Sequence, residues 1–302
     1  MKSSDSMAAE LFVTPPAPGR PAEIEEPTNR HLVHPLSRAL ATILIKTPIT
    51  PNQVSVASVF VAAGAAACYL ALPWPWAALG GLPCQFAWHV LDGADGDLAR
   101  RTGRASPMGE MVDGICDHLS QVLLYLALAT VLTWQIGPWA WALAAAAGVS
   151  HFVQANAYET GRKTYRRWVY GAGWIRQALG SVEKGGPFQG LLGRIYLSVS
   201  QLTNPGEDDL EKAIGGNVVE ASGGRLYQEL FAPLIRSSFW LSGNTRTIAV
   251  FLSMLAGSPA WFFVFETTVL NLALLRIILA RRRLNAAMVR EIAATRVTSA
   301  RP

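Results

Sequence analysis

Charged residues are scarce in this sequence. Lys, Arg, Asp and Glu make up 16% of the 302 residues, whereas soluble domains carry about 25%. Hydrophobic residues make up 51% of the chain, and the mean hydropathy is +0.24. Few charges combined with long apolar runs argue against a soluble domain and indicate a membrane protein.

Disulfide and zinc-binding cysteine patterns are also missing, and we expect no signal peptide. The three cysteines lie in apolar stretches, with neither disulfide-framework nor zinc spacing, which excludes those two classes of small domain. Residues 1–27 are rich in Pro, Glu and Ala and lack the apolar core of a signal peptide. We expect them to form a disordered cytoplasmic tail.

The apolar runs predict an all-α, polytopic membrane protein. A helix that crosses a bilayer needs about 20 mainly apolar residues. Six candidate transmembrane helices meet this requirement, two of them within one long stretch that Gly257-Ser258-Pro259 interrupts. They cover about 54–72, 75–91, 108–132, 138–157 and the two halves of 238–280.

Basic residues are absent from the three short turns on one predicted side of the membrane, 73–76, 134–139 and 257–260. All 26 Lys and Arg therefore fall on the other side. The positive-inside rule places that side, both termini and the active site in the cytoplasm, here of a bacterial inner membrane. The basic surface then faces anionic lipid headgroups of the bilayer, and no nucleic-acid partner is expected.

Two cytoplasmic regions flank the predicted spans. Residues 28–46 alternate apolar and basic positions, which predicts an amphipathic helix in the membrane interface, with Pro35 near its start. Residues 158–237 predict a helical insertion with helices near 188–202 and 225–235. The chain is thus divided into a tail (1–27), an interfacial helix with four spans (28–157), the insertion (158–237), two further spans (238–281) and a C-terminal tail (282–302).

Four aspartates carry the chemistry of the predicted fold. Asp92 and Asp95 are three residues apart at the end of the second span, and Asp113 and Asp117 are four apart at the start of the third. Each spacing places two carboxylates on one face of a helix. Ser106-Pro107 between the pairs predicts an N-cap followed by Pro at the first helical position. Because the linker is short, the four carboxylates are expected to converge.

Convergent carboxylates repel one another unless cations lie between them. Mg²⁺ and Mn²⁺ take oxygen ligands, and two such ions clamp a phosphoryl group during transfer. Gly96 and Gly109 lie one turn from aspartates and allow a ligand to approach the backbone, while Arg100 is placed to contact a diphosphate. Asp97 lies outside this pattern and is expected to face solvent.

The pattern Asp92-x2-Asp95-Gly96-x2-Ala99-Arg100-x8-Gly109-x3-Asp113-x3-Asp117 resembles the signature of the CDP-alcohol phosphatidyltransferases at every fixed position. The resemblance implies a membrane enzyme with two Mg²⁺ or Mn²⁺ ions, in which the four aspartates are the metal ligands and Asp117 is also the general base. It places the CDP moiety against Asn52, Gly96, Ala99, Arg100, Ser106 and Gly109. It also implies a homodimer.

The acceptor site is less defined by the sequence. Charged residues at membrane depth are costly and are usually functional or paired. A phosphate on the acceptor is a candidate ligand for one or more of Arg162, Arg166, Arg246 and Arg276. A structural ion pair or headgroup anchoring is at least as good an interpretation for each, and Arg281-Arg282-Arg283 predicts a simple membrane anchor.

Three functions fit these observations. In the first, a phosphatidyl group passes from CDP-diacylglycerol to a small alcohol, inositol-, glycerol-phosphate- or serine-like, with release of CMP. In the second, a CDP-linked polar alcohol donates its phospho-alcohol group to a lipid acceptor such as diacylglycerol or ceramide. The third is a transporter or scaffold with a relict site, against which the complete aspartate pattern argues.

Overall fold

The computed structural model describes residues 21–171, 187–214 and 221–299. These residues form helices and, within those ranges, no strand, so the predicted all-α class is confirmed. The chain divides into two compact units. The first contains Glu26–Gln154 and Phe239–Ala273, and the second contains the described residues of Met1–Glu25, Ala155–Ser238 and Leu274–Pro302.

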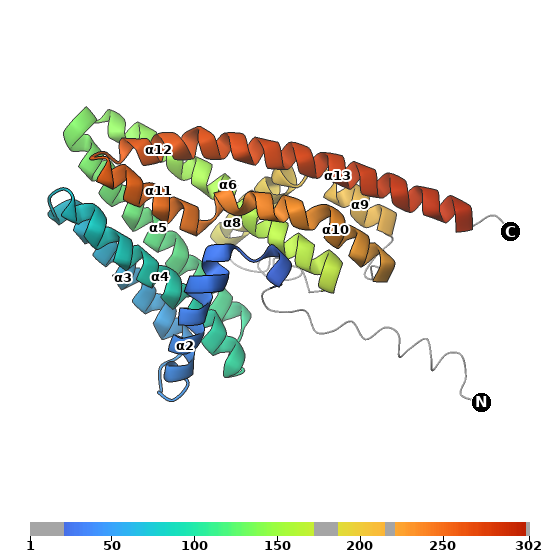
Figure 1. The fold of residues 1–302 in the computed structure, drawn as a ribbon, viewed down its shortest axis with the longest axis horizontal. Helices are drawn as coiled ribbons and strands as arrows, with labels where there is room; N and C mark the ends of the chain where they lie inside the picture. The colour runs from blue at the N-terminus through green and yellow to red at the C-terminus, as the bar shows by residue number, and fades with distance from the viewer. Residues whose placement is uncertain (1–20, 172–186, 215–220, 300–302) are drawn as a thin grey trace. The chain divides into compact units, whose positions relative to one another are not determined.

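The first unit holds the aspartates. Its helices are η2 (Asn29–Val33), α2 (His34–Leu44), α3 (Pro51–Ala71), α4 (Trp76–Arg101), α5 (Pro107–Ile136), the first half of α6 (Trp139–Tyr170), α11 (Gly243–Leu255), α12 (Ala260–Thr267) and the start of α13 (Val269–Ser299). The short helix η3 (Ser238–Leu241) precedes α11. Helix α3 packs against both α4 and α5, and α2 and α11 pack against α4 (Figure 1).

An alanine-rich apolar core holds this unit together. Small side chains such as Ala65, Ala78 and Ala147 let helix backbones approach closely, and larger ones such as Leu128 and Phe263 fill the remaining space. All five are at most 1% exposed. Tight packing of this kind leaves α3, α4 and α5 little freedom to move, and these helices carry every predicted metal ligand and CDP contact.

The helices of the site begin where the sequence predicts. Ser106 caps α5 by accepting a hydrogen bond from the Gly109 amide at 3.1 Å, with Pro107 at the first helical position, as predicted. Thr50 and Gln53 form a reciprocal capping box at the start of α3. Between α4 and α5, Gly103 has a φ of +66°, which a side chain would strain. The short linker is therefore a defined turn.

The second unit contains η1 (Ala22–Ile24), the rest of α6, α8 (Pro187–Thr203), α9 (Glu207–Ile214), α10 (Ala221–Ser237) and the remainder of α13. The helices predicted near 188–202 and 225–235 correspond to α8 and α10. Residues 21–27 of the predicted tail are structured, with Ile24 fully buried and Glu23 accepting a hydrogen bond from Tyr165 at 3.0 Å. The rest of that tail, 1–20, lies outside the described residues, as do 172–186, 215–220 and 300–302.

Arg281 differs from the anchor that the sequence predicted. Its side chain is 2% exposed, and its guanidinium lies over Gly161, where a Cβ would be 2.5 Å from Nη2. Arg282 and Arg283 are exposed. The prediction was wrong for Arg281, because consecutive residues on a helix point about 100° apart and only one of the three faces α6.

Three of the described helices are long and apolar enough to cross a membrane: Pro51–Ala71, Met108–Ile136 and Ala260–Ala294. The predicted break at 257–259 is present, because α11 ends at Leu255 and α12 begins at Ala260. Helix α11 has 13 residues, and α4 and α6 carry polar side chains along their length. The count of six spans therefore stays a prediction. A helix is also present at 29–44, and its place in the membrane interface likewise stays a prediction.

Candidate metal centre

Three of the four aspartates meet at the adjoining ends of α4 and α5. Carboxylate oxygens of Asp92, Asp113 and Asp117 all lie within 4.8 Å of one another, and the three side chains are half-buried. Helical spacing explains this directly, since Asp113 and Asp117 are one turn apart on α5 and Asp92 faces them from α4. Atoms this close are within reach of a single cation.

Asp95 is the fourth member of the cluster and lies deeper. It is 3% exposed and accepts a hydrogen bond from the Ser55 hydroxyl at 2.5 Å. Burial, followed by the negative charge of Asp113, raises the pKa of the Asp95 carboxyl to about 8, and the Ser55 hydrogen bond opposes that rise. Asp95 lies beyond the predicted second span, 75–91, and the surrounding protein causes this rise in pKa.

The cluster fits divalent cations. Three carboxylates lie within 4.8 Å of one another, and the negative charges of Asp113 and Asp92 add to burial in raising the pKa of Asp95. Hard cations such as Mg²⁺ and Mn²⁺ prefer oxygen ligands of this kind. Asp92, Asp95, Asp113 and Asp117 are called the aspartate cluster below.

The prediction that Asp97 faces solvent was wrong. Asp97 is 8% exposed rather than solvent-facing, and it accepts a hydrogen bond from Nη2 of Arg100 at 2.5 Å. The i, i+3 spacing on α4 makes this pairing local. The rest of Arg100 is exposed, so one edge of the guanidinium is held while the other remains accessible. Asp97 therefore orients Arg100.

Three predicted CDP contacts lie at the N-termini of α3 and α5, and the other three lie in the last turns of α4. A Cβ added at Gly109, in the first turn of α5, would be 3.3 Å from Oγ of Ser106 and 3.6 Å from Oδ1 of Asn52 in α3. Asn52 and Ser106 are exposed, and Gly109 is half-buried. On α4, a Cβ at Gly96 would lie 3.2 Å from Nη1 of Arg100, and Ala99 is half-buried beside it. The small residues thus leave room next to polar groups.

The acceptor candidates have different surroundings. Arg246 of α11 is 5% exposed, and its Nε donates to both carboxylate oxygens of Glu266 at 3.1 and 3.3 Å. Its Nη2 donates to Gln154 at 2.7 Å, and its Nη1 donates to the carbonyl of Leu241. Gln154 in turn donates to Asn271 at 2.8 Å. All three guanidinium nitrogens of Arg246 therefore donate hydrogen bonds inside the unit, and the side chain forms the ion pair that the sequence left open as one interpretation. Arg246, Glu266, Gln154 and Asn271 are called the Arg246 network below.

The other three candidates belong to the second unit. Arg162 and Arg166 are half-buried on α6, and the Arg162 guanidinium lies 5.4 Å from the centre of the Tyr158 ring. Arg276 of α13 is exposed. Their role toward an acceptor stays a prediction.

Ser55 is a residue of the site that sequence reasoning missed. It lies 40 positions before Asp95 and one turn into α3, and it is 3% exposed. A lone serine in an apolar span is common, so the sequence carries no signal that selects this one. Its partner becomes visible only when α3 packs against α4.

The helices and the carboxylate cluster define a class: a helical protein with candidate membrane spans and a site suited to divalent cations. The predicted resemblance is confirmed over residues 48–174, which match the family model of CDP-alcohol phosphatidyltransferase. The matched range includes α3, α4 and α5 and every residue of the aspartate cluster.

Several curated proteins are similar to this chain over part of its length. A bifunctional IPC transferase and DIPP synthase from Rubrobacter xylanophilus is 34% identical over 103 residues, 34% of this chain and 23% of that protein. The protein of the same name from Thermococcus kodakarensis is 34% identical over 106 residues, again 23% of its length. Cholinephosphotransferase 1 from Gallus gallus is 43% identical over 51 residues, 17% of this chain and 15% of that protein. The matches thus span less than a quarter of these relatives.

Proposed function

We propose that this protein catalyses metal-dependent transfer of a phosphatidyl group from CDP-diacylglycerol to a small alcohol acceptor, with release of CMP, in phospholipid synthesis. The observation that carries the proposal is the convergence of Asp92, Asp113 and Asp117 within 4.8 Å, with Asp95 beside them. The family of the domain supports the same general reaction. Inositol-, glycerol-phosphate- and serine-like alcohols are the proposed acceptors.

The aspartate cluster would hold two Mg²⁺ or Mn²⁺ ions. Bound there, such ions neutralise charge on the diphosphate and on the departing CMP. Asn52, Ser106 and Gly109 are positioned to contact the CDP moiety from two helix N-termini, with Arg100 contributing its accessible guanidinium edge to the diphosphate.

Asp117 is the proposed general base. Its half-buried carboxylate would accept the proton of the acceptor hydroxyl, whose oxygen forms a bond to the phosphorus distal to cytidine. The bond from that phosphorus to the bridging oxygen breaks, and the electron pair leaves with CMP. Each turnover thus joins the phosphatidyl group to the alcohol oxygen and leaves one proton on Asp117 for return to solvent.

The alternative reverses the two substrates. A CDP-linked polar alcohol would donate its phospho-alcohol group to a lipid acceptor such as diacylglycerol or ceramide. The similarity to cholinephosphotransferase 1 favours this alternative, and so does the burial of Arg246, whose three guanidinium nitrogens all donate inside the protein. Arg162, Arg166 and Arg276 remain the proposed phosphate contacts of a phosphorylated acceptor.

The membrane arrangement is part of the proposal. Six spans with both termini in the cytoplasm of a bacterial inner membrane, the 28–46 helix in the interface and a homodimeric assembly fit the distribution of basic residues and the family. Single cysteines at Ser258 and at Ser299, labelled in whole cells and in inverted vesicles with an impermeant maleimide, test the orientation. Labelling of both positions from the same side would contradict the proposed topology.

The deciding experiment measures CMP release by the purified protein in lipid, with Mg²⁺ or Mn²⁺. CDP-diacylglycerol is tested with a panel of alcohols, and CDP-linked alcohols are tested with diacylglycerol and ceramide. Release that depends on one alcohol and disappears in Asp117→Asn supports the first reaction and names its acceptor. Release only from a CDP-linked alcohol supports the alternative. No release in either arm from folded protein would overturn both.

A further inference from the structure

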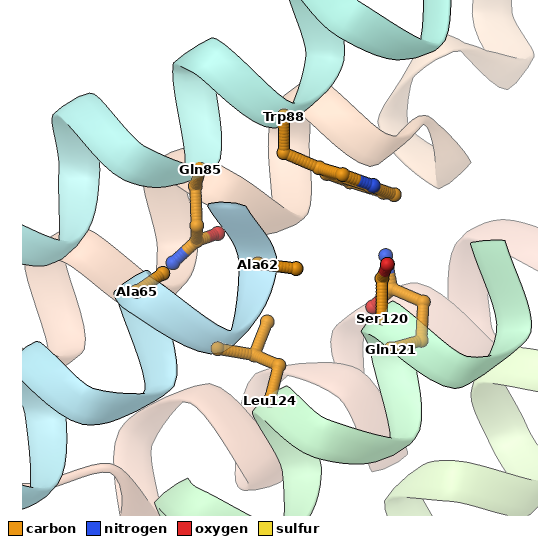
Figure 2. A pocket seen from close by; sticks show the side chains of 7 residues that line it. All are labelled: Ala62, Ala65, Gln85, Trp88, Ser120, Gln121 and Leu124. Carbon is orange, nitrogen blue, oxygen red and sulfur yellow. The ribbon is translucent and has the colours of Figure 1, made fainter. Parts of the chain in front are cut away.

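A small cavity lies beneath the aspartate cluster, between α3, α4 and α5. Its volume is about 10 Å³, and Figure 2 shows the Trp88 ring reaching from α4 over the space that Ser120 and Gln121 face from α5. Gln85 of α4 and apolar side chains of α3 and α5 complete the lining. A volume of roughly 10–15 Å³, measured for a water-sized sphere, is the least that holds one water molecule.

Two polar groups on residues that line this cavity have no hydrogen-bond partner among the described residues. They are Nε1 of Trp88, on a side chain 9% exposed, and Oγ of Ser120, on a side chain 2% exposed. A buried donor without a partner is costly, and buried indole N–H groups are usually satisfied. Gln85, which also lines the cavity, donates to the Tyr69 hydroxyl at 2.5 Å and makes no hydrogen bond to either group. The lining is mainly apolar, but it includes these two unpartnered groups, and one water molecule between them would satisfy both.

The cavity lies between the two helices that carry the metal ligands. Trp88 precedes Asp92 by four residues on α4, and Ser120 follows Asp117 by three residues on α5, so each is one helical turn from a ligand. Helices α4 and α5 are both packed on α3, more extensively than on each other. A bridge between Trp88 and Ser120 would therefore help to determine the separation of the two aspartate pairs.

We propose that one ordered water molecule occupies this cavity, bridges Nε1 of Trp88 and Oγ of Ser120, and positions the two halves of the aspartate cluster. The indole N–H donates to the water, and the serine hydroxyl either accepts from it or donates to it. Trp88 and Ser120 are positioning residues in this account. The hydration of the cavity stands on its own, whereas the effect on metal binding rests on the proposed function.

The first test is a double-mutant cycle on thermal unfolding of the full chain in detergent. Trp88→Phe removes the N–H and keeps an aromatic ring, and Ser120→Ala removes the hydroxyl. Each is expected to lower the Tm by about 2–4 °C. Because both act through the same water, the double variant is expected to lose clearly less than the sum. Additive losses would overturn the bridge.

Filling the cavity gives an independent test, because the Tm should change in opposite directions for an empty cavity and for a hydrated one. Ala62→Val adds apolar volume at the lining and keeps both polar groups. An empty apolar void would be stabilised by the added methyl groups, whereas a hydrated cavity loses its water and leaves two buried groups unsatisfied. A fall in Tm of a few degrees is expected, and a rise would contradict the hydration site.

The positioning effect is measured by Mn²⁺ binding, followed by electron paramagnetic resonance. Ser120→Ala is expected to raise the Mn²⁺ concentration at half-saturation by about three- to tenfold, because one hydrogen bond that supports the ligands is lost. The matched control is Ser58→Ala, since Ser58 is equally buried but donates to the Ser55 carbonyl at 2.7 Å, and its half-saturation is expected to stay unchanged.

The outcomes separate the two proposals. Unchanged Mn²⁺ binding in Ser120→Ala, with a lowered Tm, would overturn the positioning role and keep the hydration site. A wild-type protein that binds no Mn²⁺ would contradict the proposed function and the positioning role together. In that case the double-mutant cycle and Ala62→Val still decide whether the water is present.

Discussion

The aspartate cluster and the Arg246 network are two polar centres in the same helical unit, and they are built in opposite ways. In the network, opposite charges are paired, and the guanidinium donates to Glu266, Gln154 and Leu241 within an interior where Glu266 is fully buried. In the cluster, four carboxyl groups lie close together, and burial and the charge of Asp113 raise the pKa of Asp95 to about 8. Complete mutual satisfaction indicates a structural role, whereas concentrated like charge indicates a site that awaits a cation.

The largest expected effect comes from removing one negative charge of the cluster. Asp113→Asn should lower the rate of CMP release by at least about 10³-fold, because a metal ligand and its charge are lost together. Mn²⁺ binding should weaken in parallel. The surface variant Asp209→Asn on α9 is the control, and both quantities should match the wild type. Full activity of Asp113→Asn would show that the aspartate cluster does not take part in the reaction.

The Arg246 network should respond in stability. Glu266→Gln leaves the Arg246 charge buried without its partner, and we expect a loss of about 3–5 kcal/mol in the free energy of unfolding. The double variant Arg246→Leu/Glu266→Leu should recover much of that loss, because the uncompensated charge is gone. Denaturant unfolding in detergent measures both.

The same variants test the acceptor role of Arg246. If Arg246 instead binds a phosphate of the acceptor, Arg246→Leu raises the KM for a phosphorylated acceptor and leaves the KM for the CDP substrate unchanged. A structural role predicts no selective change in either KM. A raised KM for the phosphorylated acceptor alone would therefore assign Arg246 to the functional site.

The pKa of Asp95 predicts how the cluster depends on pH. The folded, metal-free protein holds a proton on Asp95 up to about pH 8, and the unfolded chain releases it near pH 3.8. The stabilising contribution of that proton is therefore complete below pH 3.8 and is lost as the pH rises to about 8. A cation must displace the same proton, so apparent Mn²⁺ affinity should rise up to about tenfold per unit between pH 6 and 8 and level off above.

Titration of Mn²⁺ at several pH values, together with thermal unfolding with and without the ion, measures this dependence. The gain in Tm on adding Mn²⁺ should increase from pH 6 to pH 8. An affinity that is flat over this range would show that Asp95 is already ionised in the metal-free protein.

The smallest expected effect concerns Ser55, which links the cluster to α3. Ser55→Ala removes the hydrogen bond that favours the ionised form of Asp95, worth about 1.5–3 kcal/mol for a charged acceptor. The Mn²⁺ concentration at half-saturation should rise roughly tenfold at pH 7. Ser55→Thr keeps the hydroxyl and should retain most of the affinity. Equal weakening in both variants would assign the loss to packing.

Local patterns predicted a large part of the fold and of the site. Ser106-Pro107 predicted the start of α5, and the spacings of the aspartates predicted which carboxylates share a helix face, because capping and helical periodicity act over a few residues. The break at 257–259 was predicted for the same reason. Asp97 and Arg281 were predicted wrongly, since the sequence does not show which face of a helix another helix will cover.

By itself, the sequence determined the helical class, the family of the domain and the four aspartates, because these depend on composition, helical period and fixed spacing within one segment. Only the tertiary structure decided that Ser55 supports Asp95, that Arg246 is held by Glu266 and Gln154, and that a cavity lies beneath the cluster. Those contacts join residues 20 to 92 positions apart. They follow from how side-chain volumes fit between packed helices, which no local pattern encodes.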